Sequence, residues 1–276
     1  MNIDGCSPAV ADSVARIALG ISYHGGAYQG WQSQPSGLTI QDRVEAALTL
    51  FVGNSMRVNC AGRTDAGVHA LMQVVHLDSP VSRDSFSWVR GTNAFLPKDI
   101  AVEWAKPVPD QFHARASALA RRYIYVLKEA AVRPALESGL VGWVFRPLDR
   151  DAMLAAAMHL VGKHDFTSFR ASGCQSPSPI KTMSATRISR QGAYWRFEFQ
   201  ADAFLHHMIR NIMGCLIAVG SGQRSPEWVG EVLAARNRDA AAPTFPPDGL
   251  YFAGPVYAPQ WGLPDRTPAF DWIPNP

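Results

Sequence analysis

Hydrophobic residues recur at every second position in some segments of the chain and at every third or fourth position in others. The first spacing predicts strands and the second predicts helices. Between residues 194 and 201, Trp195, Phe197 and Phe199 alternate with polar residues, as in a strand that buries one face. After Thr39, which opens a capping-box pattern, apolar residues recur at the three- and four-residue spacing of a helix. The same criteria predict strands at 16–24, 57–61, 72–77, 100–108, 121–128, 182–190 and 250–257, and helices at 84–94, 149–161, 204–219 and 227–235.

These elements follow the order β-α-β-β-α-β twice, once in residues 16–110 and once in residues 111–257. We therefore expect an α+β chain whose two ferredoxin-like or RRM-like halves join into one extended, mainly antiparallel sheet. Such a sheet leaves one face open, an arrangement that RNA-binding modules use. Residues 1–15 are small and polar, and residues 258–276 hold five of the 20 prolines, so both are expected to be weakly ordered tails.

Composition and charge narrow the class of protein. The chain has 276 residues, 47% hydrophobic and 18% charged, which is typical of a globular protein with one large or two modest domains. A formal net charge of +3 permits a nucleic-acid partner without requiring one. No apolar stretch approaches the length of a membrane span and no export signal is visible, so we expect no membrane partner. The 4 cysteines contain no Cys-x-x-Cys pair, which favours the reducing cytoplasm.

The segment 62–70 (GRTDAGVHA) is the strongest candidate for chemistry, because it sets an aspartate in a glycine-flanked loop between two predicted strands. Glycines allow a substrate to approach the backbone closely. The guanidinium of Arg63, two positions before Asp65, favours the ionised carboxylate, which can act as a nucleophile or a base. The same residues also fit a turn with a solvated Asp and Arg, and spacing alone favours neither interpretation.

Histidines suggest a metal site in which Asp65, His69 and His76 are the ligands. The spacing favours it only weakly, since the glycines disfavour the helix that would align Asp65 with His69. We therefore expect no metal ion. The pairs at 164–165 (HD) and 206–207 (HH) are expected to be structural, because adjacent residues of a regular element point in different directions.

Arginines near aromatic or apolar residues are further candidates. Arg210 lies on an apolar predicted helix and needs a carboxylate if it is buried, which Asp65 could supply, although an exposed arginine is commoner. Arg121 and Arg122 precede Tyr123, a mixture that suits phosphates and unstacked bases but also a strand with one core face. The polar loop 173–179 could become ordered on a ligand.

Together these residues resemble the TruA family of pseudouridine synthases over residues 16 to about 256. The resemblance rests on an ordered series of motifs: GGAYQGWQ at 25–32, GRTDAGVHA at 62–70, LP at 96–97, DI at 99–100, FHAR at 112–115, RRYIY at 121–125, HDFTSF at 164–169, FLHHMIRNIMG at 204–214 and GL at 249–250. The chain departs from the family pattern at His24, where an aspartate is expected, and at Ala116, where an aromatic residue is expected.

The resemblance implies a catalytic cleft between the two halves, in which Asp65 attacks a flipped-out uridine so that a C–N glycosidic bond breaks and a C–C bond forms. It implies no cofactor, which agrees with the lack of a phosphate-cradling loop or dinucleotide fingerprint in the sequence. Arg63 would help to extrude the base, Tyr123 would stack on it, Arg210 would pair with Asp65, and Leu250 would pack under the base. RNA contacts are implied for Arg83, Phe112, His113, Ala114, Arg115, Ala116, Gly173, Cys174, Gln175, Ser176 and Pro177.

In this family the substrates are uridines at positions 38, 39 and 40 of the tRNA anticodon stem and loop, recognised by a homodimer. A dimer would account for the modest charge, because two basic surfaces can surround one tRNA. Two alternatives remain at this point. One is a non-catalytic RNA-binding module of the same fold, and the weaker one is a metal-dependent hydrolase that uses Asp65 and His69.

Overall fold

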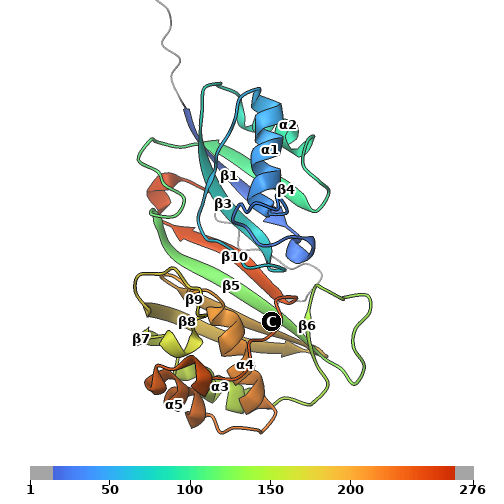
Figure 1. The fold of residues 1–276 in the computed structure, drawn as a ribbon, viewed down its shortest axis with the longest axis vertical. Helices are drawn as coiled ribbons and strands as arrows, with labels where there is room; N and C mark the ends of the chain where they lie inside the picture. The colour runs from blue at the N-terminus through green and yellow to red at the C-terminus, as the bar shows by residue number, and fades with distance from the viewer. Residues whose placement is uncertain (1–14, 265–276) are drawn as a thin grey trace, which may run out of the picture.

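The computed structural model describes residues 15–264, in which ten strands pair into one sheet. The strands are β1 (Ala15–Tyr23), β2 (Asn59–Cys60), β3 (His69–Ser79), β4 (Ile100–Pro107), β5 (Ala118–Glu129), β6 (Gly142–Val144), β7 (Gly162–Asp165), β8 (Ile180–Gln191), β9 (Tyr194–Ala201) and β10 (Leu250–Tyr257). The helices are α1 (Ile40–Val52), α2 (Ser85–Asn93), α3 (Arg150–Met158), α4 (Met208–Gly220) and α5 (Glu227–Ala235). Figure 1 shows α1 and α2 over one half of the sheet and α3, α4 and α5 over the other.

The strand order is β4-β1-β3-β10-β5-β9-β8-β7, with β2 paired to β3 and β6 paired to β5. Each half repeats one arrangement, in which its first strand pairs with its last: β1 lies between β3 and β4, and β5 lies between β9 and β10. Strand β10 joins the halves, because it pairs in parallel with β3 and antiparallel with β5. The pairings other than β10 with β3 and β5 with β6 are antiparallel. The predicted fold class is thus confirmed.

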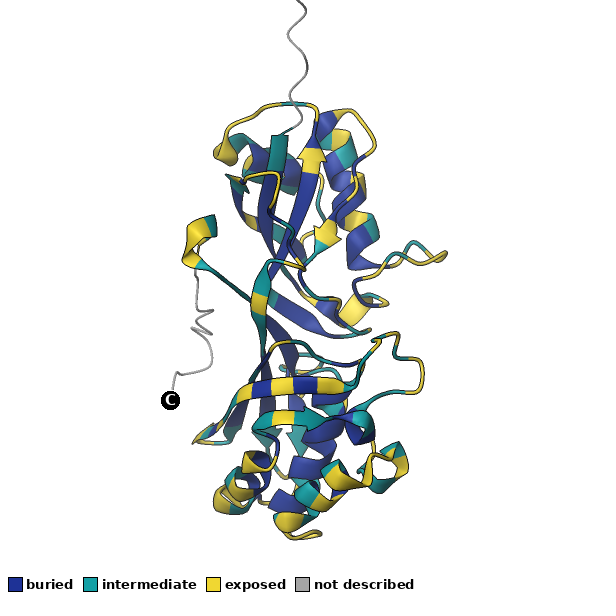
Figure 2. Cartoon of the chain, turned by 90° about the vertical axis from the view of Figure 1, so that its left-hand side faces the viewer, coloured by how far each residue is buried: buried dark blue, intermediate teal, exposed yellow. Residues whose placement is uncertain are grey.

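The main core lies between the helices and one face of this sheet. Alternate residues of β1, such as Ile17 and Leu19, and of β9, such as Phe197, are buried in it. The buried residues continue through both halves without a break at β10 (Figure 2). The two halves therefore share one core and one sheet.

The helix starts show which sequence signals were informative. Thr39 caps α1 by accepting a hydrogen bond from the backbone N–H of Asp42, as the capping-box pattern predicts. Helix α4 begins at Met208, four residues later than the predicted 204, because His207 adopts a left-handed conformation with φ of +60°. Strands β6 and β7 were not predicted, since three or four residues are too few to show an alternation.

The opposite face of the sheet is partly covered by chain segments rather than helices. Phe112 and Ala114 are fully buried there, and Phe112 packs against Tyr257 and Trp261 with ring centroids 5.3 Å apart in each case. Trp261 belongs to the 3-10 turn Pro259–Trp261, so residues 258–264 of the predicted tail are packed on the sheet. Residues 1–14 and 265–276 of the predicted tails lie outside the described residues. No helix in the described part is long and apolar enough to cross a membrane.

Candidate active site

The loop that carries Asp65 lies between β2 and β3 and is held by buried side chains. Gln73 of β3 donates a hydrogen bond from its amide to the carbonyl of Gly62 (2.5 Å) and accepts one from the Gly62 N–H (3.3 Å). The carbonyl of Thr64 accepts a hydrogen bond from the backbone N–H of Trp31 (3.0 Å). The hydroxyl of Thr64 shares another with that of Tyr23 (2.8 Å). These bonds fix the backbone on both sides of Arg63.

Two glycines are required by the close packing of this loop. Gly67 has a φ of +80°, and a Cβ on it would lie 2.8 Å from Cγ of Pro247. A Cβ on Gly30 would lie 2.6 Å from the carbonyl oxygen of Thr64. The glycine that follows Asp65 in the motif, and Gly30 packed against the loop, are therefore positions with no room for a side chain.

The side chain of Asp65 meets the C-terminal half at the start of α4. His206 Nε2 lies 3.4 Å from Oδ1, and His207 Nε2 lies 3.7 Å from Oδ2. Arg210 NH1 lies 3.7 Å from Oδ2, and its Nε donates a hydrogen bond to the carbonyl of Phe245 (2.8 Å). The structure thus brings Asp65 and Arg210 together across the junction of the halves, in a site to which each half contributes.

His206 and His207 are the site residues that sequence reasoning missed. They do not point apart as expected, because the left-handed backbone of His207 turns both rings toward Asp65, with ring centroids 4.0 Å apart. Burial lowers the pKa of His207, the Asp65 carboxylate acts in the opposite direction, and His206, Arg210 and Arg238 lower it further. Two adjacent histidines just before an apolar helix are a signal that the sequence contains. The predicted helix 204–219 included both of them, and its regular geometry would point their rings in different directions.

Aromatic and apolar residues of the central strands form a floor beside Asp65. The ring of Tyr123 on β5 packs against Phe204 and Phe252, with centroids 5.1 Å and 5.0 Å away. Leu250 is buried on β10, two residues before Phe252 and therefore on the same face of the sheet. Burial and the negative charge of Asp65 raise the pKa of Tyr123, so its hydroxyl stays protonated at neutral pH.

The loop 173–177 lies next to the Asp65 loop. Arg63 is exposed, and its NH1 is 3.4 Å from Oε1 of Gln175. Arg170 shapes the loop by donating hydrogen bonds to the carbonyls of Cys174 (2.6 Å) and Ser176 (2.9 Å). Gly173, Gln175 and Pro177 are exposed. Arg63 and this loop therefore form an exposed rim beside Asp65.

The segment 112–116 is also close to the Asp65 loop, but its residues differ in accessibility. Arg121 links the two by donating hydrogen bonds to the carbonyls of Ala61 (3.2 Å) and Arg115 (2.6 Å). Phe112 and Ala114 are fully buried, whereas His113 is partly exposed and Arg115 and Ala116 are exposed. The residues of this segment that reach a solvent-facing surface are thus His113, Arg115 and Ala116.

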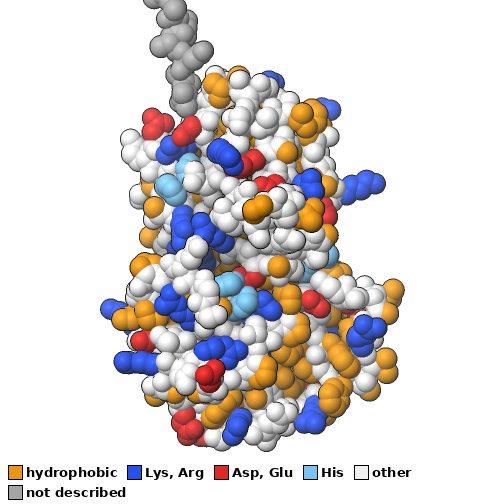
Figure 3. All heavy atoms as spheres, in the orientation of Figure 1, with side chains coloured by type: hydrophobic (Ala, Val, Ile, Leu, Met, Phe, Trp, Pro, Cys, Tyr) orange, Lys and Arg blue, Asp and Glu red, His pale blue; other side chains and the backbone are white. Residues whose placement is uncertain are grey.

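Arg83 lies away from this site. It is exposed just after β3, with its guanidinium 4.6 Å above the ring of Phe51. Strand β3 starts beside the Asp65 loop and runs for 11 residues before the chain reaches Arg83. The length of this strand places Arg83 about 30 Å from the Asp65 loop. Cationic side chains gather near the junction of the halves on the face seen in Figure 3.

His69 and His76 do not form a cluster of possible metal ligands with Asp65 among the described residues, so the weakly favoured arrangement of these three ligands does not form. His69 Nδ1 accepts a hydrogen bond from the N–H of Gly25 (3.1 Å), and its Nε2 donates to the carbonyls of Gly139 (2.9 Å) and Asp248 (3.1 Å). His76 Nδ1 accepts from the N–H of Ala114 (3.1 Å). Both rings are buried, and burial lowers the pKa of each to about 4.

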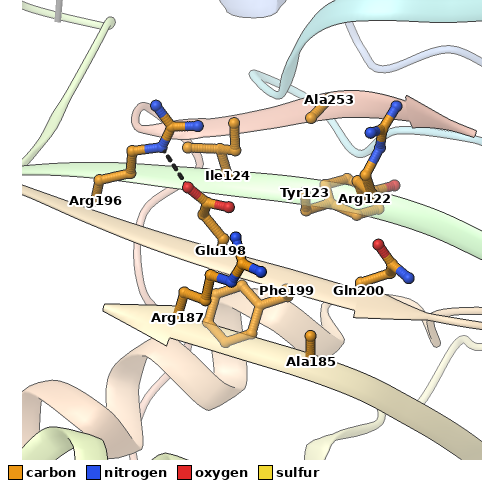
Figure 4. A pocket seen from close by; sticks show the side chains of 10 residues that line it. All are labelled: Arg122, Tyr123, Ile124, Ala185, Arg187, Arg196, Glu198, Phe199, Gln200 and Ala253. Carbon is orange, nitrogen blue, oxygen red and sulfur yellow. Dashed lines mark ion pairs between the residues drawn. The ribbon is translucent and has the colours of Figure 1, made fainter. Parts of the chain in front are cut away.

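A cavity of about 280 Å³ lies on the opposite face of the sheet (Figure 4). Arg122, Arg187 and the ion pair between Arg196 and Glu198 (2.7 Å) line it. Arg122 and Tyr123 are neighbours on β5 and point to opposite faces. This cavity is therefore separated by the sheet from Asp65.

Comparison with known proteins identifies the family. A family model described as tRNA pseudouridine synthase matches residues 21–115 and 156–258. The chain belongs to this family. It is 68% identical over 263 residues to tRNA pseudouridine synthase A of Polaromonas naphthalenivorans (strain CJ2), and 62% identical over 277 residues to that of Paracidovorax citrulli (strain AAC00-1). Each similarity covers 94% of this chain and 100% of the relative.

Membership of the family makes the chain an isomerase, and the alternative of a non-catalytic RNA-binding module is not favoured. A solved structure, "Crystal Structure of a Cbf5-Nop10-Gar1 Complex", is 10% identical to this chain and matches 81% of it and 60% of the other chain. Its TM-score of 0.34 is too low to establish a common fold.

Proposed function

We propose that this chain isomerises uridine to pseudouridine at positions 38, 39 and 40 of the tRNA anticodon stem and loop, with Asp65 as the nucleophile and without a cofactor. The observation that carries the proposal is the position of the Asp65 carboxylate, presented by a rigid loop at the junction of the halves and 3.7 Å from Arg210. A carboxylate held in one orientation beside a fixed cation is suited to nucleophilic attack.

The reaction rearranges bonds within one nucleotide. The Asp65 carboxylate bonds to the nucleotide as the C–N glycosidic bond breaks. A bond then forms between the ribose carbon and C5 of the uracil, the bond to Asp65 breaks, C5 loses its proton and N1 gains one. The nucleotide must leave the base stack to reach Asp65. Tyr123 and Leu250 would receive the base, and Arg63 at the rim would occupy the place that it vacates. Because the product is an isomer, no oxidant or energy source is consumed.

We propose that the tRNA follows the exposed residues beside the cleft. Arg63 and Arg115 supply positive charge for phosphates, and His113 supplies a ring on which a base can stack. The remaining contacts are assigned to Ala116, Gly173, Cys174, Gln175, Ser176 and Pro177, with Arg83 reached by a more distant part of the RNA. Phe112 and Ala114 are buried and act by holding His113 and Arg115 in place.

The reaction is tested by tritium release from tRNA that carries uridine labelled at C5. We expect release by the wild type and none by Asp65→Ala, while tRNA binding by the variant is retained. Asp239→Asn, which changes an exposed carboxylate on the 3-10 turn Arg238–Ala240, is the matched control and should release tritium normally. Release by Asp65→Ala at the wild-type rate would overturn the mechanism. Binding without release by the wild type would restore the RNA-binding module.

We further propose that the enzyme is a cytoplasmic homodimer. Support for the dimer comes from apolar side chains left exposed between β5 and α3: Val132 is 79% exposed, Leu136 94% and Phe145 60%. A group of exposed apolar residues is typical of a protein interface. Support for the cytoplasm comes from Cys60, Cys174 and Cys215, which are free thiols.

A further inference from the structure

Three side chains at the start of α4 and in the Asp65 loop present metal-ligating atoms to one another. One ligand atom each from Asp65, His206 and His207 can be chosen so that all lie within 4.8 Å of one another. The nitrogen-to-oxygen distances are 3.4 Å for His206 and 3.7 Å for His207. A tetrahedral ion with bonds of about 2.1 Å needs ligand atoms about 3.4 Å apart. The first distance is to Oδ1 and the second to Oδ2 of Asp65, so each imidazole lies near the tetrahedral spacing from one carboxylate oxygen.

The ligands are held on rigid supports. The Asp65 loop is fixed by buried hydrogen bonds, and the two histidines lie between the buried residues Leu205 and Met208. The left-handed conformation of His207 lets two consecutive residues serve one ion, which a continuous helix would not allow. The sequence-based expectation that the pair at 206–207 is structural assumed that these rings point apart.

The ligand chemistry selects the class of ion. Two imidazoles and one carboxylate suit Zn²⁺ and related transition metals, whereas Mg²⁺ and Ca²⁺ prefer sites made of oxygen ligands. The side chains of His206 and His207 are 44% and 29% exposed, so an ion can enter from solvent and keep a water molecule in a fourth position. The site would therefore exchange its ion with solvent, unlike a closed structural site.

We propose that Asp65, His206 and His207 form an inhibitory binding site for a divalent transition-metal ion. The binding of the ion is independent of RNA, but its inhibitory effect rests on the proposed function, because the ion occupies the carboxylate that attacks uridine. Arg210 NH1 lies 3.7 Å from Oδ2 of Asp65, and its positive charge repels a metal ion bound to the same carboxylate. Its charge keeps the affinity moderate and the ion removable by a chelator.

Binding is tested first, with Zn²⁺ alone and the full chain without RNA. We expect calorimetry to detect one bound ion in the wild type. This ion should be missing from a double variant, His206→Gln with His207→Gln. The double variant keeps its cysteines, so any binding of Zn²⁺ by thiols is unchanged. Each single variant should weaken binding by at least about tenfold. His159→Gln, an exposed histidine at the end of α3, is the matched control and should bind as the wild type does. Equal Zn²⁺ binding by the wild type and the double variant would overturn the site.

Inhibition is tested second, by tritium release in the presence of Zn²⁺. We expect Zn²⁺ to abolish release by the wild type and by His159→Gln, EDTA to restore it, and equimolar extra Mg²⁺ to leave it unchanged. Zn²⁺ that binds at the three residues without slowing release would overturn the inhibitory role. Zn²⁺ binding in a chain that releases no tritium would instead contradict the proposed function and leave the metal site intact.

Discussion

At the scale of residues, the sequence indicates the loop that carries Asp65 and its partner Arg210, but not its two histidine partners. The motif at 62–70 combines Asp65 with Gly67, whose positive φ and close packing require a glycine, so the loop could be predicted from local chemistry. Its contacts with His206 and His207 could not, because they depend on one backbone angle at His207. A φ of +60° is uncommon for a residue with a side chain and leaves no mark in the hydrophobic pattern.

Arg115→Ala should weaken tRNA binding with little effect on turnover of bound tRNA. Its side chain is exposed, and in the proposed complex it carries one positive charge toward the RNA. Loss of one phosphate contact should reduce the slope of log affinity against log salt concentration by about one. A filter-binding titration at several salt concentrations measures this slope. Arg150→Ala, which removes an exposed arginine at the start of α3, should leave it unchanged.

At the scale of elements, strand and helix order could be predicted, whereas several ends could not. The alternation in β9 and the cap of α1 are local signals, and both are present in the structure. Helix α4 starts after His207, and His206 and His207 contact Asp65, which lies about 140 residues earlier in the chain. The insertion of the last strand, β10, between β3 and β5 also depends on long-range packing, so the sequence pattern could not predict it.

Two glycines inside helices should respond in opposite ways to alanine. A Cβ on Gly214 of α4 would lie 2.2 Å from the backbone oxygen of Pro243, so Gly214→Ala should lower the free energy of unfolding by roughly 1–3 kcal/mol. A Cβ on Gly230 of α5 would lie 3.1 Å from the ring of His159, which can move. Gly230→Ala should therefore be neutral or gain up to about 1 kcal/mol.

Urea denaturation of both glycine variants measures the difference. Gly214→Ala should also reduce tritium release, because the segment that ends at Phe245 holds Arg210 through two hydrogen bonds, one of 2.8 Å and one of 3.1 Å. Equal stability of the two variants would show that the backbone at Pro243 moves freely.

At the scale of the whole molecule, buried histidines make stability depend on pH. His69 bonds to both halves, through Gly25 on one side and Gly139 and Asp248 on the other. His76 accepts a hydrogen bond from the N–H of Ala114, in the segment between β4 and β5. Each ring accepts a backbone hydrogen bond at Nδ1, which requires that nitrogen to be unprotonated. Protonation would therefore loosen the connection between the halves.

The free energy of unfolding should fall as the pH decreases from about 6.5 toward 4. The folded rings have pKa values lowered to about 4, whereas the unfolded rings titrate near 6.5, so the unfolded chain binds more protons in this window. The expected loss at about pH 5 is roughly 2 kcal/mol for each ring. Urea denaturation at about pH 7 and about pH 5 measures it. His76→Gln should show a smaller loss than the wild type, and an equal loss would contradict the role of His76.

The proposed dimer can be tested at its exposed apolar residues. Leu136→Asp places a charge on the most exposed of them and should shift the mass from light scattering toward that of a monomer. Leu50→Asp is the matched control, because Leu50 is 65% exposed on α1 in the other half. A wild type that is monomeric at micromolar concentration would contradict the proposal.

Strand β10 also sets the order in which the enzyme can be completed during synthesis. It supplies Leu250 and Phe252 to the floor of the site and pairs with both β3 and β5. A nascent chain that has not yet reached residue 250 can form much of each half, but it cannot join them. The ribosome must therefore make nearly the whole described chain before Asp65 faces a finished pocket. Premature termination before residue 250 would leave two partial sheets with exposed edges, which are prone to aggregation.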